Sequence, residues 1–259
     1  MQLVHQRIDP SAAPADGARA IVLVHGITER GASWQPLLAP LAADHTVLVV
    51  DLRGHGDSPK GDSYDPMTMA ADVHDTVLAA HLGDERPLLI GHSLGGVVVS
   101  AYGAAFPTRG VINVDQPLRL ASFKDTLGQL EPMLRGDRAS FDGAIAMVFS
   151  MMMGPLGADE AARIGALRRA DPDVVLGIWG TVFDSTPEEL DAQIEALAGA
   201  IRVPYLSLHG VEQGPDYAPW LTGLVPSATV EVWPDHGHYP HLVDPDRFLR
   251  RVHDFEASL

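Results

Sequence analysis

Short apolar runs recur along the chain and predict strands that are buried on both faces. Each run is rich in Val, Ile or Leu, as expected for a parallel sheet that is covered by helices on both sides. The runs span residues 20–25, 46–51, 87–91, 111–115, 203–209 and 229–233.

Helical patterns fill the stretches between these runs, and their ends carry recognisable signals. Asp65 followed by Pro66 is a typical helix start, because it places an N-cap before a proline at the first helical position. Gly83 fits the far end of that helix, and Asp244 followed by Pro245 starts a helix near the end of the sequence. The alternation indicates an α/β protein with a mostly parallel central sheet and helices on both faces.

The alternation stops between residues 118 and 199, where the pattern is helical. Asp171 and Thr186, each followed by proline, are helix starts, and Glu189 is placed to form a capping box with Thr186. We interpret this stretch as a helical cap inserted into an α/β core. A stripe of Met is more often core than binding surface, but flexible Met side chains can line an adaptable pocket.

These boundaries predict an α/β core of residues 1–117 and 200–259 and a helical cap of residues 118–199. The residues of the cap that we expect to contact a substrate are Met147, Met151, Trp179 and Phe183.

Composition narrows the class of protein. The 259 residues include no Cys, which excludes disulfides and a Cys nucleophile, and a net charge of −16 argues against nucleic acid and anionic membranes as partners. No apolar run is long enough to span a membrane, and the first residues lack the pattern of a signal peptide. We therefore expect a cytoplasmic protein whose partner is a small-molecule substrate, with no cofactor.

The most informative stretch is residues 91–96, GHSLGG, which stands between a predicted strand and a predicted helix. In this context G-x-S-x-G indicates a nucleophile elbow, a strained turn that projects the Ser93 hydroxyl above the sheet. A Cβ at Gly91 or Gly95 would clash where strand and helix crowd together. The N–H of Leu94 then lies at a helix N-terminus, where it can stabilise an oxyanion.

A serine hydroxyl is a poor nucleophile without an adjacent base that is itself oriented by an acid. The candidate bases are His236, His238 and His241, in the loop after the last predicted strand. The three histidines lack an accompanying carboxylate at a spacing such as H-E-x-x-H, which argues against a metal site.

Four segments resemble, in order and spacing, those of the α/β-hydrolase fold, and the resemblance covers most of the chain outside residues 118–199. They are residues 25–27 (HGI), 51–58 (DLRGHGDS), 91–96 (GHSLGG) and 237–242 (GHYPHL).

The resemblance implies roles for individual residues. His238 is the general base, and the backbone N–H of Ile27 is the oxyanion donor that complements Leu94. Residues 51–58 are structural. Trp34, in the loop after Ile27, packs a helix or reaches the rim of the pocket.

The acid remains open among three carboxylates. The commonest position in the family lies in the loop after residues 203–209, where the expected slot holds Gln213. Glu212 is one residue out of register, and Asp216 comes three residues late. Asp115 ends the preceding predicted strand, where certain lactonases, dehalogenases and cofactor-free dioxygenases of the family place their acid. We favour Asp115 and keep Glu212 and Asp216 as alternatives.

The resemblance implies a serine-dependent hydrolase that forms an acyl-enzyme. The Met, Phe and Trp residues of the cap favour an apolar carboxylic ester, lactone or thioester as the substrate. One alternative is a cofactor-free oxygenase or perhydrolase; in the oxygenase the serine only orients the substrate. A third class is a non-catalytic small-molecule receptor, which would not need a base and an acid.

Overall fold

The computed structural model describes residues 1–11, 19–82 and 86–259, and Gly83 lies outside this range. Seven strands form one sheet in the order β1-β3-β2-β4-β5-β6-β7. Their bounds are β1 His5–Ile8, β2 Arg19–Val24, β3 His45–Val50, β4 Leu88–His92, β5 Gly110–Val114, β6 Tyr205–His209 and β7 Ala228–Val232.

The sheet is mostly parallel, as the apolar runs predicted. Only β1 is antiparallel, paired with β3, whereas β2 runs parallel to both β3 and β4 in a register that pairs Val22 with Leu48 and Leu89. All six predicted strands are present within two residues of their expected bounds. The short strand β1 was not predicted.

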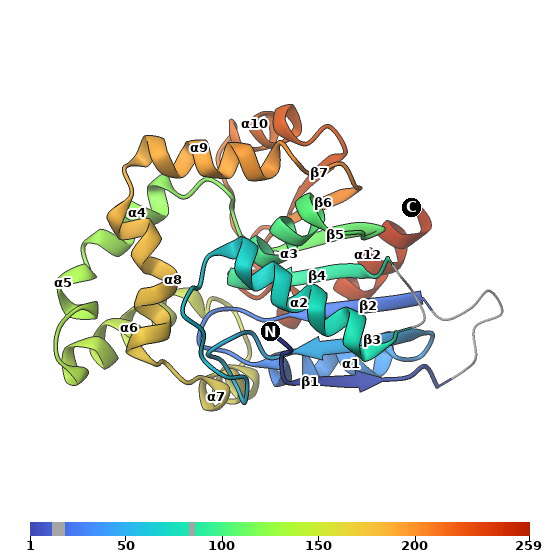
Figure 1. Cartoon of the computed structure of the whole chain (residues 1–259), viewed down its shortest axis with the longest axis horizontal. Helices are drawn as coiled ribbons and strands as arrows, with labels where there is room; N and C mark the ends of the chain where they lie inside the picture. Colours follow the sequence, from blue (N-terminus) through green and yellow to red (C-terminus); the bar gives the residue numbers. More distant parts are fainter. Residues whose placement is uncertain (12–18, 83–85) are drawn as a thin grey trace.

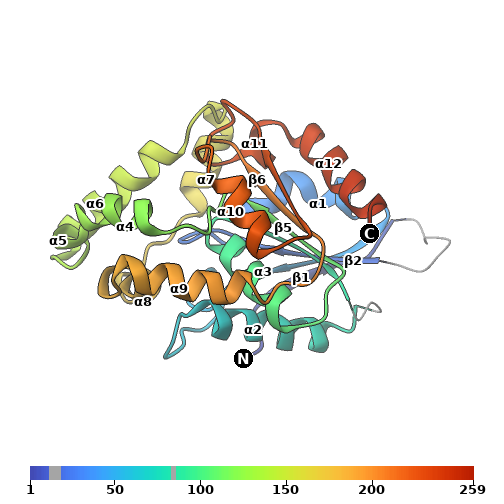
Figure 2. The ribbon, with the colours of Figure 1, turned by 90° about the horizontal axis from the view of Figure 1, so that it is seen from above.

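Helices cover both faces of the sheet (Figures 1 and 2). Those that alternate with the strands are η1 Gly31–Trp34, α1 Gln35–Leu41, α2 Pro66–Ala80, α3 Leu94–Ala105, α10 Tyr217–Leu224, α11 Pro240–Val243 and α12 Pro245–Ala257. Six further helices lie between β5 and β6: α4 Ala121–Gly128, α5 Glu131–Leu134, α6 Arg138–Met152, α7 Ala158–Leu167, α8 Pro172–Asp184 and α9 Pro187–Ala198.

The predicted helix starts are observed as caps. The Asp65 carboxylate accepts the Thr68 N–H at the start of α2, and the Asp171 carboxylate accepts two N–H groups at the start of α8. Thr186 and Glu189 form a complete capping box at the start of α9.

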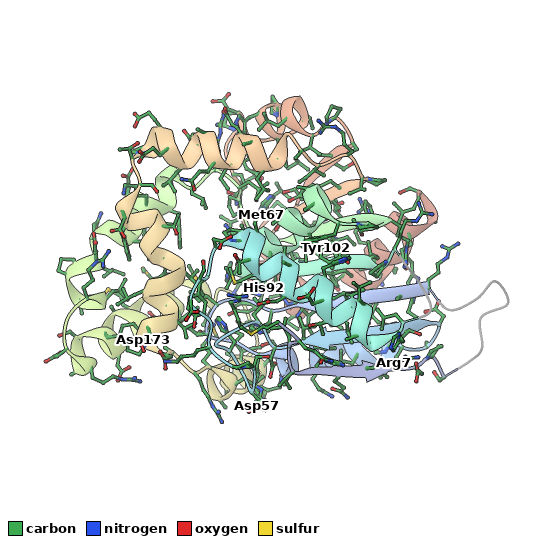
Figure 3. The ribbon with its side chains drawn as sticks, viewed as in Figure 1. Arg7, Asp57, Met67, His92, Tyr102 and Asp173 are labelled. Atoms are coloured by element: carbon green, nitrogen blue, oxygen red, sulfur yellow. The ribbon has the colours of Figure 1, made fainter. Side chains whose placement is uncertain are left out.

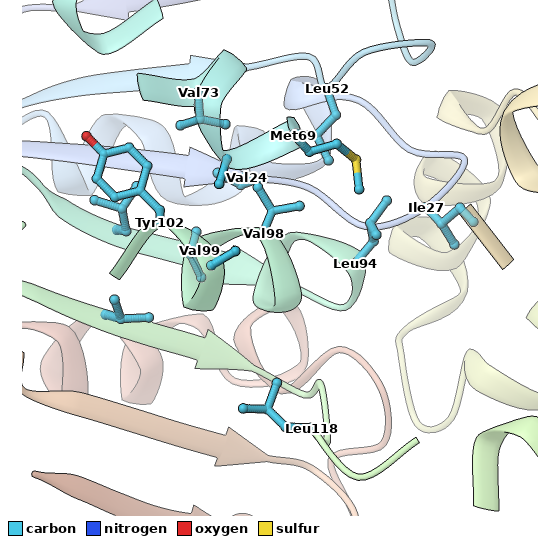
Figure 4. Packing of buried hydrophobic residues seen from close by; sticks show 14 of the residues in the cluster. Val24, Ile27, Leu52, Met69, Val73, Leu94, Val98, Val99, Tyr102 and Leu118 are labelled. Atoms are coloured by element: carbon cyan, nitrogen blue, oxygen red, sulfur yellow. The ribbon is translucent and has the colours of Figure 1, made fainter. Parts of the chain in front are cut away.

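The core has two layers because side chains alternate along each strand. Val22 and Val24 of β2 face α2 and α3, whereas Ile21 and Leu23 face α1 and α12. In the first layer the side chains of α2 and α3 interleave above β2, with Ile27 at the edge of the cluster (Figure 4).

The helices α4–α9 lie beyond the carboxyl ends of the parallel strands (Figure 1). We call residues 118–199 the helical insertion. Within the described ranges, no helix is long and apolar enough to cross a membrane.

Candidate active site

The turn between β4 and α3 holds Ser93 in a backbone conformation that is unusual for a residue other than glycine. Its φ and ψ angles are 52° and −123°, and it is the N-cap of α3. A Cβ on Gly91 would lie 2.1 Å from the carbonyl oxygen of Gly95, and a Cβ on Gly95 would lie 2.2 Å from that of Val24. The turn therefore needs glycine at both positions, and it projects Ser93 from a strained backbone.

The loop after β2 packs directly on this turn. A Cβ on Gly26 would lie 3.2 Å from the Cβ of Ser93. His25 fixes the loop, because its Nδ1–H donates to the Gly26 carbonyl at 2.7 Å and its Nε2 accepts the Leu52 N–H at 3.0 Å. Burial, and then the neighbouring His55, lowers the pKa of His25 to about 3, so its ring is neutral near pH 7.

Sheet topology explains why these two loops meet. The chain passes from β2 to β3 on one side and then returns to place β4 on the other side of β2. In open α/β sheets the crevice at such a reversal is the usual place for a ligand. Ile27 follows β2 and Ser93 follows β4, so both flank this crevice.

Asp115 and His238 form the central polar contact of the site. Asp115 directly follows β5 with φ 51°, and its Oδ2 accepts a hydrogen bond from His238 Nδ1 at 2.7 Å. Its Oδ1 accepts the Gly210 N–H at 2.8 Å. Burial alone would raise the pKa of Asp115, but the hydrogen bonds and the His238 charge outweigh it, so this pKa lies below its ordinary value. Asp115 is therefore a carboxylate at neutral pH.

Two glycines bring the loop of His238 against the end of β6. A Cβ on Gly210 would lie only 1.9 Å from the carbonyl oxygen of Gly237, and the Gly237 N–H donates to the Gly210 carbonyl at 3.1 Å. This close backbone contact places His238 next to Asp115.

A further hydrogen bond, which sequence reasoning missed, joins the turn of Ser93 to the loop of His238. His92, labelled in Figure 3, ends β4 and donates from Nε2 to the backbone carbonyl of His238 at 2.8 Å. Burial, and then the charge of His238, lowers the pKa of His92 well below its ordinary value. His92 is thus a neutral hydrogen-bond donor. In the sequence, only its position directly before Ser93 indicated that it could contribute to the site.

The alternative acids lie elsewhere. Glu212 and Asp216 are exposed, and within the described part of the chain neither donates to nor accepts from His238. Gln213, in the slot where the resemblance placed an acid, lines the cavity described next. The structure thus brings His238 together with Asp115 rather than with either alternative.

A cavity of about 860 Å³ lies between the carboxyl edge of the sheet and the helical insertion. It is lined by all five residues that we expected in the chemistry, namely Ser93, His238, Asp115, Ile27 and Leu94. The insertion contributes mostly apolar side chains, among them Phe123, Phe149, Met152, Ile178, Trp179, Leu190 and Ile194.

Of the substrate-contacting residues that we expected in the insertion, only Trp179 lines this cavity. Met147 and Met151 are 46% and 63% exposed and point away, whereas Phe149 and Met152 of the same helix face the cavity. Phe183 is buried but is not part of the lining; its ring lies beneath the Arg135 guanidinium.

Of the two roles expected for Trp34, helix packing and the rim of the pocket, the structure shows packing, because Trp34 does not line the cavity. It is 1% exposed and packs in a tilted arrangement against His241 and Phe248, with ring centroids 4.7 and 6.5 Å away, in the layer covered by α1 and α12. Its role is packing of the core.

The three histidines of the last loop diverge. His241 is buried against Trp34, His236 bonds the Pro234 carbonyl through Nδ1, and only His238 reaches the cavity. Among the residues with described positions, no group of three His, Asp or Glu side chains is arranged to hold a metal ion.

Comparison with known proteins gives partial sequence matches and extensive structural matches. "Putative carbamate hydrolase RutD" from Shigella flexneri is 33% identical over 103 residues, which cover 39% of this chain and 38% of that protein. The chain therefore matches less than half of the length of this relative.

Two solved structures cover nearly the whole chain. A thermophilic esterase from Thermogutta terrifontis has a TM-score of 0.73 at 22% identity, covering 99% of this chain and 93% of the other. The enol-lactonase from Burkholderia xenovorans LB400 has a TM-score of 0.66 at 22% identity, covering 98% and 96%. At such identities the likeness shows a shared fold.

The model of the alpha/beta hydrolase family matches residues 21–251, which include both the sheet and the helical insertion. The chain belongs to the alpha/beta hydrolase family.

Proposed function

We propose that this protein is a serine hydrolase that forms an acyl-enzyme on Ser93 with an apolar carboxylic ester, lactone or thioester. His238 is the general base, Asp115 is the acid that orients it, and the N–H groups of Ile27 and Leu94 bind the oxyanion. One observation carries the proposal: Asp115 and His238 are joined by a hydrogen bond, and both line the same cavity as Ser93, which lies in a strained turn.

The reaction proceeds in two steps on these groups. His238 takes the Ser93 proton as the hydroxyl attacks the substrate carbonyl, and later gives the proton to the leaving oxygen or sulfur. Asp115 holds the proton on His238 Nδ1, so that Nε2 is the basic nitrogen, and stabilises the imidazolium that forms. Water, activated by His238, then releases the acid.

Two features of the backbone support Ile27 and Leu94 as the oxyanion donors. Leu94 is the residue after the nucleophile, at the N-terminus of α3, where backbone N–H groups have no partner within the helix. The loop of Ile27 packs on the elbow through Gly26. Two converging N–H groups there would stabilise the charge that develops on the carbonyl oxygen.

The lining of the cavity supports an apolar acyl group. Among the described residues that line it, the only side chains that carry charge or titrate are those of Tyr64, Asp65, Asp115, Arg119 and His238. Leu94, Val97 and Ala104 of α3 line the cavity along this helix, and the ten residue steps from Leu94 to Ala104 span about 15 Å at 1.5 Å per residue. An elongated hydrocarbon chain fits such a path.

The test is hydrolysis of p-nitrophenyl esters of increasing acyl length by wild-type protein and Ser93→Ala. We expect wild-type turnover to rise with chain length over the first members and Ser93→Ala to lose at least about 1000-fold. Turnover retained in Ser93→Ala would reject the acyl-enzyme and would favour chemistry in which Ser93 only orients the substrate.

A further inference from the structure

A second group of polar side chains, two buried and one partly buried, adjoins the loops of Ile27 and His238 and takes no part in the proposed reaction. It consists of Glu29, Arg168 and Tyr239, and we call it the Glu29 cluster. Glu29 lies two residues after Ile27, and Tyr239 directly follows His238. Arg168 is the C-cap residue directly after α7 of the helical insertion.

The contacts of the Glu29 cluster join these three parts of the chain. Tyr239 Oη donates to Glu29 Oε1 at 2.6 Å. The Arg168 guanidinium donates to Tyr239 Oη and lies 3.8 Å from Glu29 Oε1. The neighbouring Arg169 N–H donates to the Thr28 carbonyl at 2.8 Å, which is a second link between the insertion and the same loop.

The Glu29 side chain is only 2% exposed, and Tyr239 and Arg168 are the polar partners of its Oε1. A buried carboxylate without a partner is strongly destabilising. Burial, and then the charge of Glu29, raises the pKa of Tyr239 well above its ordinary value, so the hydroxyl keeps its proton and remains a donor. Loss of Tyr239 Oη or of Arg168 therefore leaves Glu29 in an unfavourable position and displaces its loop.

Arg168 also contacts a residue that lines the cavity. Its guanidinium lies 3.7 Å above the ring centroid of Phe149, which lines the cavity. Arg168 thus contacts Glu29, Tyr239 and a lining residue of the cavity at the same time.

We infer that Glu29, Arg168 and Tyr239 are positioning residues, through which the docked helical insertion sets the relative placement of the Ile27 N–H and the His238 ring. The insertion then has a second role besides covering the substrate, because it aligns the catalytic groups. This inference rests on the proposed function of Ser93, His238 and Ile27.

Positioning residues act on the transition state more than on binding. A displacement of about 1 Å in a catalytic group can cost about 100-fold in rate. Glu29 and Tyr239 do not line the cavity, and the Met side chain in Arg168→Met would keep an apolar contact with Phe149, the lining residue beside it. We therefore expect the rate of the chemical step to fall while the affinity for an apolar ligand is retained.

The experiment measures labelling of Ser93 by an alkyl fluorophosphonate, whose phosphorus takes the place of the carbonyl carbon and loses fluoride. The maximal rate and the concentration for half-maximal rate are measured separately for Glu29→Gln, Tyr239→Phe and Arg168→Met. We expect each variant to lose at least about tenfold in maximal rate. The half-maximal concentration should stay within about twofold, because ground-state binding is unchanged.

The double variant Arg168→Met/Tyr239→Phe gives an independent readout. Because both side chains act through Glu29, their losses should not multiply. We expect the maximal labelling rate of the double variant to be within about twofold of that of the slower single variant.

Two matched controls separate positioning from general stability. Arg163 also reaches from α7 to the core, where it donates to the Ala32 and Ser33 carbonyls at 2.8 and 2.9 Å without touching Glu29. Tyr205 has a fully buried hydroxyl that is bonded to Ser100 and is remote from the Glu29 cluster. Arg163→Met and Tyr205→Phe should keep the wild-type labelling rate.

The outcomes distinguish this inference from the proposed function. If wild-type protein is not labelled at Ser93, the proposed function fails. If wild-type protein is labelled but Tyr239→Phe and Glu29→Gln label at the wild-type rate, the positioning role is overturned and the proposed function stands. Equal losses in Arg163→Met and Arg168→Met would also overturn it, because they would reflect docking in general.

Discussion

Asp115 and His238 are 123 residues apart in the sequence, yet their side chains meet at 2.7 Å. The contact exists because three loops at the carboxyl edge of the sheet converge. Asp115 directly follows β5, Gly210 directly follows β6, and His238 lies in the loop after β7. The Gly210 N–H donates to the other oxygen of the Asp115 carboxylate.

Replacing Asp115 by Asn should nearly abolish turnover. The amide would favour the wrong tautomer of His238 and could not stabilise the imidazolium, a change that cost about 10⁴-fold in kcat in a serine protease. The measurement is kcat for a p-nitrophenyl ester. Glu212→Gln removes a neighbouring exposed carboxylate and should leave kcat unchanged; a loss in Glu212→Gln with none in Asp115→Asn would reverse the assignment of the acid.

Gly210→Ala should displace the loop of His238. The added Cβ would lie 1.9 Å from the Gly237 carbonyl, so the backbone has to move, at a cost of about 1–3 kcal/mol in the free energy of unfolding. We expect kcat to fall together with stability in urea denaturation.

The matched control is Gly223→Ala. Gly223 lies in α10, and an added Cβ there has no described atom within 4 Å. This substitution should keep full activity and, by helix propensity, raise stability by up to about 1 kcal/mol. Equal activity of the two variants would show that the close Gly210–Gly237 contact does not position His238.

Trp179→Ala should alter the preference for acyl chain length, because Trp179 lines the cavity. Truncating it removes apolar contact area and opens space, so kcat/KM for the preferred ester should fall while longer or branched esters gain relative to it. Met151→Ala lies on the exposed side of α6 and should leave the profile unchanged. A shifted profile in Met151→Ala alone would contradict this description of the cavity.

Acid should destabilise the fold through its buried histidines. Burial lowers the pKa of His25 to about 3 and that of His209 to about 4. These rings stay neutral in the folded protein, whereas in the unfolded chain they take up protons below about pH 6.5. Their stabilisation is therefore complete above that pH and is lost as the pH falls toward the folded values, by about 1 kcal/mol per pH unit for each ring.

Urea denaturation between pH 7 and pH 4.5 measures this slope. His209→Gln should make the dependence shallower, whereas His81→Asn, at an exposed left-handed position that suits Asn, should not change it. His45 acts in the opposite direction, because Glu256 outweighs burial and raises the pKa of His45. Stability that is flat or rises toward pH 4.5 would contradict the neutral burial of these rings.

The sheet could be predicted from the sequence because strands buried on both faces leave continuous apolar runs, and caps such as Asp65 and Thr186 are local signals. The strand β1 lacks such a run. It has four residues, His5–Ile8, on the edge of the sheet, and two of them are exposed polar side chains. Only its pairing with β3 makes it a strand.

The misplaced residues of the insertion have a different cause. A group of Met and Phe indicates an apolar surface but does not say which side of the helix faces the cavity. In α6, Phe149 and Met152 face inward, and Met147 and Met151, one turn apart, face outward. The Glu29 cluster could not be predicted either, because its partners are distant in the sequence and isolated charges give no periodic signal.

Intact-mass measurement after incubation with a fluorophosphonate tests most directly whether Ser93 is the nucleophile. We expect one adduct per chain, mapped by peptide sequencing to Ser93, with no adduct in Ser93→Ala and slow labelling in His238→Ala. Labelling that persists in Ser93→Ala, or wild-type protein that stays unmodified while it hydrolyses esters, would contradict an acyl-enzyme on this serine.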